Sequence, residues 1–280
     1  MRKVLEKKEP PMTNTLTNIY QILNFDDAQL KKYIQQDEEI LIIDILKGIE
    51  SGNVALREEL CMRLFKRMNE LDLITIHAMQ SFYDALLTKE YLYYTNSEDS
   101  NAVFKRVTSA LILIEIIQNP LFDLDLSFVA KYLSFEKDGR GYVNADQGWA
   151  DAIGTAVELC STAVSNKYFD VSTGAAILQA MKTSIWQSNP YSNNEDERLA
   201  KLIVKLISNG VPEEIIIEWV EQLFDRLQFY SYEKGFTPEW YQARTNTLLV
   251  IKSLYFYLKY SKQSKELLAV ISIFIPRYIL

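Results

Sequence analysis

Residues 53–68 read NVALREELCMRLFKRM, and this stretch decides the fold class. Its apolar side chains recur every three or four residues, and charged side chains fill the positions between them. The apolar set is Leu56, Leu60, Cys61, Leu64, Phe65 and Met68; the charged set, which continues to Glu70, is Arg57, Glu58, Arg63, Lys66, Arg67 and Glu70. A helix with one buried face and one solvated face has this pattern, so we expect Arg57 at the surface.

The same period continues along the chain, and start signals agree with it. After Pro212 the apolar stripe consists of Ile216, Trp219, Val220, Leu223, Phe224 and Leu227. Thr237 before Pro238 predicts a helix start, and Asn194 with Glu197 predicts another that begins with a capping box. The chain has only 9 glycines and 7 prolines in 280 residues, which favours long helices over many short strands.

The predicted fold is all-α, with about twelve helices paired as antiparallel hairpins. The hairpins are expected to begin near Asn53, Ser97, Ala145, Asn194 and Thr237. These starts lie roughly 43 to 49 residues apart, close to the length of a two-helix HEAT-type unit. We therefore predict a HEAT-like α/α superhelix of stacked hairpins, with a closed α/α toroid as the alternative.

We predict one domain and a cytoplasmic, soluble protein. Residues 1–12 are expected to form a flexible tail, and residues 13–280 a single all-helical domain. No apolar segment opens the chain or reaches the roughly 18 residues of a membrane span, so no membrane association is expected. Cys61 and Cys160 lie on apolar helix faces, which predicts buried free thiols in a reducing compartment.

Charge and residue usage exclude several function classes. The net charge of −7 and a pI near 5.0 argue against nucleic-acid binding, because an acidic surface repels phosphates. The single histidine, His77, and two remote cysteines cannot supply a histidine-rich or zinc site, so we predict no metal. Motifs of the GxSxG, P-loop and GxGxxG types are missing, which argues against triad hydrolysis and predicts no cofactor.

Three stretches concentrate residues that could bind a ligand: 97–110, 138–152 and 235–246. The second holds three of the nine glycines together with an arginine, a tyrosine, a tryptophan and several carboxylates. Loops of this composition often carry binding sites. The candidate ligand-binding residues are Lys105, Arg106, Arg140, Tyr142, Trp149, Asp151, Glu158, Arg244 and Asn246.

Sequence blocks within these stretches also carry a family likeness. They are Val103-Phe104-Lys105-Arg106 with Ser109-Ala110, Arg140-Gly141-Tyr142-Val143 with Gly148-Trp149-Ala150, and Ala243-Arg244 with Asn246 and Leu254-Tyr255. In this order the blocks resemble a family of uncharacterised bacterial proteins catalogued as a domain of unknown function, over about residues 97–257. The resemblance implies no established activity. It also implies histidines in the helix after Ala150, where this chain has Asp151 and Thr155, so any metal or proton-transfer role of those histidines would be absent here.

Three hypotheses for function remain open. The first is a cytosolic scaffold whose concave face binds a protein or peptide, as helical-repeat proteins commonly do. The second is a basic pocket for a small anionic ligand, formed by Lys105, Arg106, Arg140 and Arg244.

The third hypothesis is a groove for a sugar-like ligand, with Trp149 as stacking platform and Asp151 and Glu158 as an acid–base pair for hydrolysis. On one helix those two residues lie about 10.5 Å apart along the axis, longer than the carboxyl separation of inverting glycosidases. Hydrolysis would therefore need another carboxylate, such as Asp99. Whether the chain is an enzyme stays open at this point.

Overall fold

The computed structural model describes residues 20–51, 55–96, 98–119, 124–187 and 189–279. Over these residues the protein is all-α, with 13 helices and one small two-stranded sheet, so the predicted fold class is confirmed. The tail predicted for residues 1–12, and the hairpin starts predicted at Asn53 and Ser97, lie outside the described residues. In the described part of the chain, no helix has the length and apolar character needed to cross a membrane.

The chain divides into two compact units, residues 1–85 and 86–280, and each is described by itself. The prediction of a single domain stays a prediction. The first unit contains α2 (Asp27–Glu50), the π-helical segment η1 (Ala55–Met62), α3 (Arg63–Glu70) and α4 (Ile76–Leu86). Asp26 and Gln29 form a capping box at the start of α2, and Phe65 packs edge-on against Phe82 in the core.

The stretch from which the fold class was predicted is helical over its described residues, 55–68. One of its side chains does not lie on the face expected for it. Leu64, Phe65 and Met68 are buried on one side of α3, as predicted. Arg57 is 2% exposed, so its predicted surface position is wrong. Arg57 precedes Cys61 by four residues and Leu64 by seven, so helical spacing places it on the apolar face, and its assignment to the charged face was mistaken. Burial lowers the pKa of Arg57 from its ordinary value.

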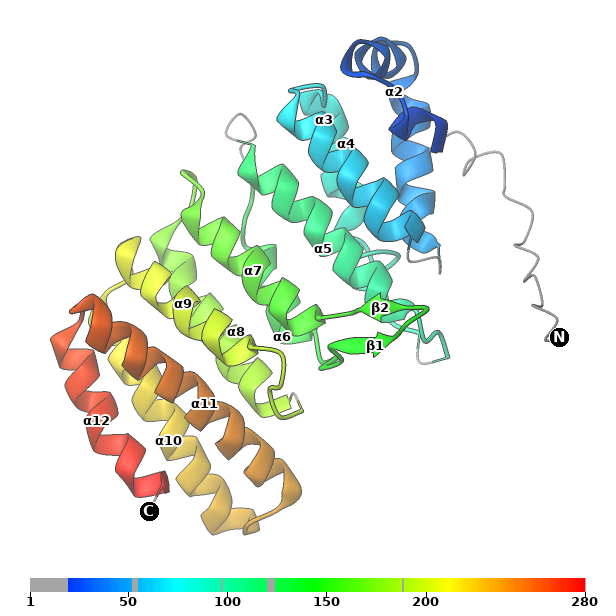
Figure 1. The fold of residues 1–280 in the computed structure, drawn as a ribbon. Coiled ribbons are helices and arrows are strands. Elements are labelled where there is room, and N and C mark those ends of the chain that lie inside the picture. Colours follow the sequence, from blue (N-terminus) through cyan, green and yellow to red (C-terminus); the bar gives the residue numbers. More distant parts are fainter. Residues whose placement is uncertain (1–19, 52–54, 97, 120–123, 188, 280) are drawn as a thin grey trace, which may run out of the picture. The chain divides into compact units, whose positions relative to one another are not determined.

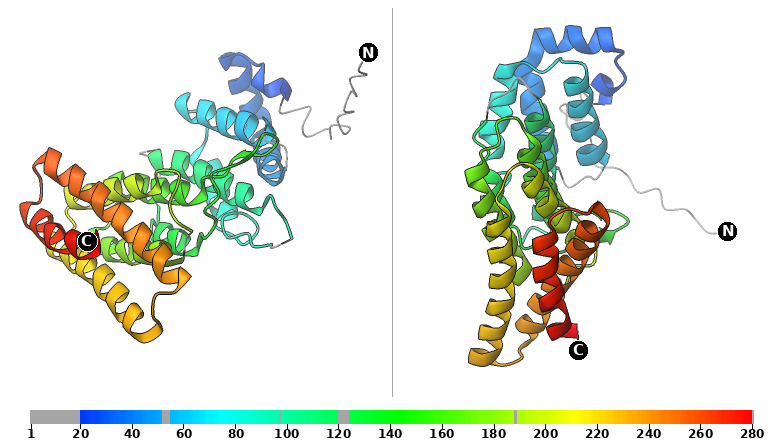
Figure 2. Two further views of the ribbon diagram at one scale, coloured as in Figure 1. Left: turned by 60° about the horizontal axis from the view of Figure 1, so that its bottom comes forward. Right: turned by 90° about the vertical axis from the view of Figure 1, so that its left-hand side faces the viewer.

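The second unit has two layers of helices (Figures 1 and 2). One layer contains α5 (Ala102–Gln118), α7 (Ala152–Ser165), α9 (Glu195–Ser208) and α11 (Pro238–Ser261), and the other contains α6 (Phe128–Phe135), α8 (Gly174–Gln187), α10 (Glu213–Lys234) and α12 (Lys265–Ile279). Each helix packs against the next helix of its own layer. α6 also packs on α7, while α10 and α12 pack on α11, so three pairs of consecutive helices are packed together.

The apolar stripes predict which helix faces are buried. Every residue predicted for the stripe after Pro212 is buried in α10. Thr237 caps α11 by accepting a hydrogen bond from the backbone N–H of Trp240, with Pro238 as the first helical residue. The capping box predicted for α9 is wrong, because Asn194 makes no side-chain cap.

A two-stranded hairpin, β1 (Tyr142–Asn144) and β2 (Gly148–Trp149), precedes α7 (Figure 1). Val143 packs inward on a cluster of buried α5 and α7 residues that includes Phe104 and Ala152. Tyr142 points outward, as alternation along a strand requires. A glycine-rich loop was expected here from the sequence, and the two paired strands were not predicted.

Both cysteines are buried free thiols, as predicted. Burial raises the pKa of Cys61 to about 12 and raises that of Cys160 further. A thiol that stays protonated is a poor nucleophile, so both residues serve as small apolar core groups.

Asn246 connects α11 to the end of α8. Its carboxamide oxygen accepts the backbone N–H of Tyr191 at 2.9 Å, and its nitrogen donates to the carbonyls of Ile185 and Asn189, each at 3.2 Å. The side chain is fully buried. A buried amide with these partners is a structural group, and it is unavailable to a ligand.

We predict that Asn246→Ala lowers the free energy of unfolding by at least about 2 kcal/mol, because buried backbone groups lose their partners. Thr247→Val on the same helix is the control. The hydroxyl of Thr247 donates only to the carbonyl of Ala243 one turn earlier, so its loss should cost less than about 1 kcal/mol. Urea unfolding measures both values, and equal losses would contradict the role given to Asn246.

Candidate functional site

The structure brings two of the three predicted stretches together at the N-terminal ends of α5 and α7. The side chain of Gln147 donates to that of Asn101 at 3.0 Å, which joins stretch 138–152 to stretch 97–110. Within 138–152, the backbone N–H of Asp151 donates to the carbonyl of Arg140 at 2.9 Å. The third stretch lies elsewhere in the second unit: Asn246 contacts the segment after α8, and Arg244 contacts the last helix. The nine candidate residues therefore do not form one pocket.

Arg106 is a buried structural cation. Its guanidinium makes a two-point ion pair with Glu136, with Nε to Oε2 at 2.7 Å and Nη2 to Oε1 at 2.8 Å. The hydroxyl of Tyr132 donates to the same carboxylate at 3.2 Å. Burial disfavours the charged guanidinium, but the hydrogen bond and charge of Glu136 outweigh it and raise the pKa of Arg106. The charge of Arg106 is therefore already paired with the carboxylate of Glu136.

Arg140 and Lys105 are also engaged. The guanidinium of Arg140 lies 2.6 Å from the carboxylate of Asp138, and this pair raises the pKa of Arg140. The ammonium of Lys105 lies over the ring of Tyr94, 4.4 Å from its centroid. Two cations of the predicted basic pocket, Arg106 and Arg140, are thus paired with carboxylates, whereas Lys105 has an aromatic contact.

Asp151 is paired with Arg198, a residue that was not among the candidates predicted from the sequence. Its backbone is left-handed, with φ of 51°, and its Oδ2 lies 2.7 Å from Nη1 of Arg198 on α9. Burial raises the pKa of Asp151, although Arg198 partly opposes that shift. Gly154 lets the pair approach, because a Cβ at that position would lie 2.2 Å from the guanidinium. Glu158, the proposed partner in hydrolysis, is exposed on α7.

Tyr142 and Trp149 form an exposed aromatic pair on the hairpin. Their ring centroids are 5.7 Å apart in an edge-to-face arrangement, and more than half of each side chain is accessible. The pair could serve as a stacking surface, as the sequence predicted for Trp149. Because Arg106 and Arg140 are already paired with carboxylates, few hydrogen-bond donors near this aromatic pair are free for a polar ligand.

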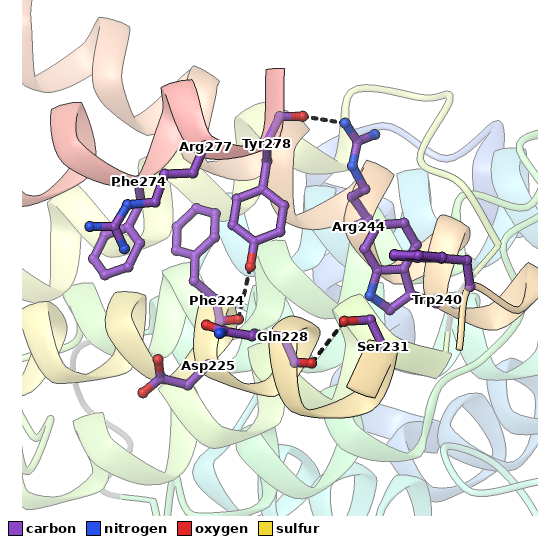
Figure 3. Close-up of a pocket in the computed structure, with 10 residues that line it drawn as sticks. Phe224, Asp225, Gln228, Ser231, Trp240, Arg244, Phe274, Arg277 and Tyr278 are labelled. Atoms are coloured by element: carbon purple, nitrogen blue, oxygen red, sulfur yellow. Dashed lines mark hydrogen bonds between the residues drawn. The ribbon is translucent and has the colours of Figure 1, made fainter. Parts of the chain in front are cut away.

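A cavity of about 570 Å³ lies between α10, α11 and α12 (Figure 3). This volume is in the range of small-molecule sites. Its lining consists of Phe224, Asp225, Gln228, Ser231, Phe236, Trp240, Arg244, Phe274, Arg277 and Tyr278. Arg244 is the only one of the nine candidate residues in this lining.

The arginines of this cavity differ from those at the hairpin. Arg244 donates one hydrogen bond to the carbonyl of Tyr278 and lies 5.9 Å from the ring of Trp240. Arg277 lies 5.2 Å from the ring of Phe274. Among the described residues, no carboxylate comes within 4.0 Å of either guanidinium. Both guanidiniums therefore have donors available for an anion.

The cavity wall between them is aromatic. Phe224 and Phe274 stack with centroids 4.7 Å apart, and Phe224 lies 5.1 Å from the ring of Tyr278. Burial raises the pKa of Tyr278, so its hydroxyl stays protonated and donates to the carbonyl of Phe224 at 3.2 Å. In the view of Figure 3 the two guanidiniums lie on either side of the Phe224 and Tyr278 rings.

This cavity was not predicted from the sequence, although one of its walls follows a helical pattern. Phe274, Arg277 and Tyr278 are spaced i, i+3 and i+4, so a helix places them on one face. Within the described residues, no group of three His, Cys, Asp or Glu side chains lies close enough together to hold a metal ion.

A family model described as "Protein of unknown function (DUF2785)" matches residues 92–256. The predicted resemblance to a family of unknown function is thereby confirmed. All three candidate stretches fall inside the matched range, whereas Phe274, Arg277 and Tyr278 follow it. No curated protein and no solved structure matches the chain.

We predict that Glu136→Gln costs about 3 kcal/mol of unfolding free energy, because it leaves Arg106 charged and buried. Asp27→Asn is the matched control, since Asp27 pairs with Arg67 at the surface and its loss should cost less than about 1 kcal/mol. Urea unfolding at neutral pH measures both, and a small loss for Glu136→Gln would contradict a structural role for this ion pair.

A second prediction concerns pH. Burial raises the pKa of Asp151 above the ordinary 3.8, so the folded state keeps this proton to higher pH than the unfolded chain. Stability contributed by this group therefore falls as pH rises from about 3.8 through the raised pKa. Relative to Asp151→Asn, the wild-type protein should lose unfolding free energy across this interval.

Asp170→Asn provides a control with the opposite sign. Hydrogen bonds from Ser172 lower the pKa of Asp170, so the wild-type protein should gain stability relative to that variant as pH rises. Urea unfolding at several pH values between about 2.5 and 6.5 measures both differences, since the change at Asp170 occurs below and around its ordinary pKa of 3.8. The same slope for both variants would show that burial does not govern Asp151.

Proposed function

We propose that this chain, which belongs to the DUF2785 family of proteins of unknown function, binds an anionic ligand in the cavity between α10, α11 and α12. One observation carries the proposal: the guanidiniums of Arg244 and Arg277 line this cavity without a carboxylate partner among the described residues. Guanidiniums in such a setting recognise carboxylate or phosphate groups.

The charge distribution supports this choice of site. The chain is acidic overall, and the arginines that surround the hairpin are each paired with a carboxylate. An anion gains little near those neutralised groups. The cavity lining has two guanidiniums, Arg244 and Arg277, against one carboxylate, Asp225, and neither guanidinium is paired with it, which favours this cavity over the predicted basic pocket.

The walls indicate what else the ligand carries. Phe224, Phe274 and Trp240 present aromatic surface to the cavity, and rings or other planar apolar groups stack favourably on such surface. Gln228 and Ser231 add polar groups at the rim. We therefore propose a ligand with an anionic group beside a planar or apolar one.

The proposal extends to the architecture and setting of the protein. The two packed layers of residues 86–280 support a HEAT-like α/α superhelix, the scaffold on which we place the binding function. The two buried free thiols support a reducing, cytoplasmic compartment. Hydrolysis of sugars at Asp151 and Glu158 is less well supported, since Asp151 pairs with Arg198 and Glu158 is exposed.

Phenyl phosphate and benzoate test this function, because each joins a planar ring to an anionic group. Isothermal titration calorimetry should show saturable binding of at least one by the wild-type protein. Arg277→Gln should weaken it about tenfold, as expected when a charge-assisted hydrogen bond is lost.

The matched control is Arg226→Gln. Arg226 lies on α10 over the ring of Trp186, at 4.2 Å, and does not line the cavity. Its replacement should leave the affinity unchanged. If the wild-type protein binds neither compound, or if both variants lose affinity equally, the proposal is wrong.

A further inference from the structure

The cavity continues along α10 as an exposed groove. A second hollow of about 440 Å³ is lined by Asp225, Gln228, Phe229, Ser231 and Tyr232. It shares Asp225, Gln228 and Ser231 with the first cavity. The two hollows are therefore neighbouring parts of one surface, which we call the α10 groove.

The far part of this groove exposes aromatic side chains. Phe229 is 66% exposed and Tyr232 is 87% exposed, and Phe236, at the near end, is 66% exposed. A surface this rich in exposed aromatic residues is unusual unless a partner covers it. Such residues are also the ones that contribute most to binding when they become buried at an interface.

The α10 groove is larger than a ring with one anionic group needs. Its second hollow runs beside the first cavity along the same part of α10 and adds the exposed side chains of Phe229 and Tyr232. The amide of Gln228, which makes no hydrogen bond with another described side chain, lies in this part and can bond to a peptide backbone. The two guanidiniums on either side of the aromatic wall also suit a ligand with more than one acidic group (Figure 3).

We propose that the occupant of the α10 groove is an acidic peptide segment of a partner protein, with its carboxylates at Arg244 and Arg277 and its apolar side chains on Phe229 and Tyr232. This inference rests on the proposed function and names its ligand class. Charge complementarity selects the occupant: the groove lining has two guanidiniums and one carboxylate, Asp225, so an acidic segment meets net positive charge. The chain's own first residues include Arg2, Lys3, Lys7 and Lys8, which would meet those guanidiniums with like charge.

Selection from a displayed library of random heptapeptides tests the inference on the full-length protein. Peptides that carry Asp or Glu next to Leu, Phe or Trp should be enriched on the wild-type protein, and phenyl phosphate should displace them. The double variant Phe229→Ser/Tyr232→Ser should weaken the selected peptides about tenfold or more while leaving phenyl phosphate binding unchanged.

The matched control is Phe256→Ser/Tyr260→Ser. These α11 side chains are similarly exposed and stacked, but they do not line the α10 groove. This variant should bind the selected peptides like the wild-type protein. Circular dichroism and thermal melting of both double variants check that each stays folded.

The outcomes separate this inference from the function on which it rests. If phenyl phosphate binds and Arg277→Gln weakens it, but no acidic peptide is enriched or the α10 variant has no effect, the peptide inference fails and anion binding stands. If neither binds, both fail. If sedimentation shows self-association that the α10 variant abolishes, the occupant is a second copy of this chain and the peptide inference is overturned.

Discussion

A guanidinium that leaves water needs a new partner, and this requirement organises the polar part of the second unit. Arg106 is almost fully buried and is stable there because Glu136 meets it with two hydrogen bonds. Arg198 bridges α9 to the residue before α7 by pairing with Asp151. In the cavity between the last three helices one guanidinium is half-buried, with an aromatic face and one carbonyl as partners, and the other is exposed beside an aromatic ring. The proposed anion would pair with both.

Most of the fold could be predicted from the sequence, because its helices carry their signals locally. Each residue predicted for the α10 stripe is buried, and the Thr237-Pro238 start of α11 is in place. The prediction failed at Arg57, because a charged side chain was assigned to the solvated face although its spacing from Cys61 and Leu64 places it on the apolar one. It failed again at the 142–149 hairpin, which forms where Val143 and Ala150 pack against α5.

The site was harder to predict, because charge pairing depends on residues far apart in the chain. Arg106 and Glu136 are 30 positions apart, and nothing in the spacing around Arg106 shows that its charge is already used. Arg244 was predicted to share a basic pocket with cations of other stretches, whereas its neighbours Phe274, Arg277 and Tyr278 come from α12. Their spacing marks one helix face, yet only the packing of α12 on α10 and α11 makes that face a cavity wall.

We propose that Arg244 and Arg277 are available to an anion, whereas Arg106, Arg140 and Arg198 are each paired with a carboxylate. Nitrogen-15 NMR of the arginine Nε–H groups, recorded while phenyl phosphate is added, tests this proposal at the atoms concerned. Saturable shifts are expected for Arg244 and Arg277, and none for the three paired arginines. Unshifted Arg244 and Arg277 signals, or equal shifts of all five, would contradict the proposal.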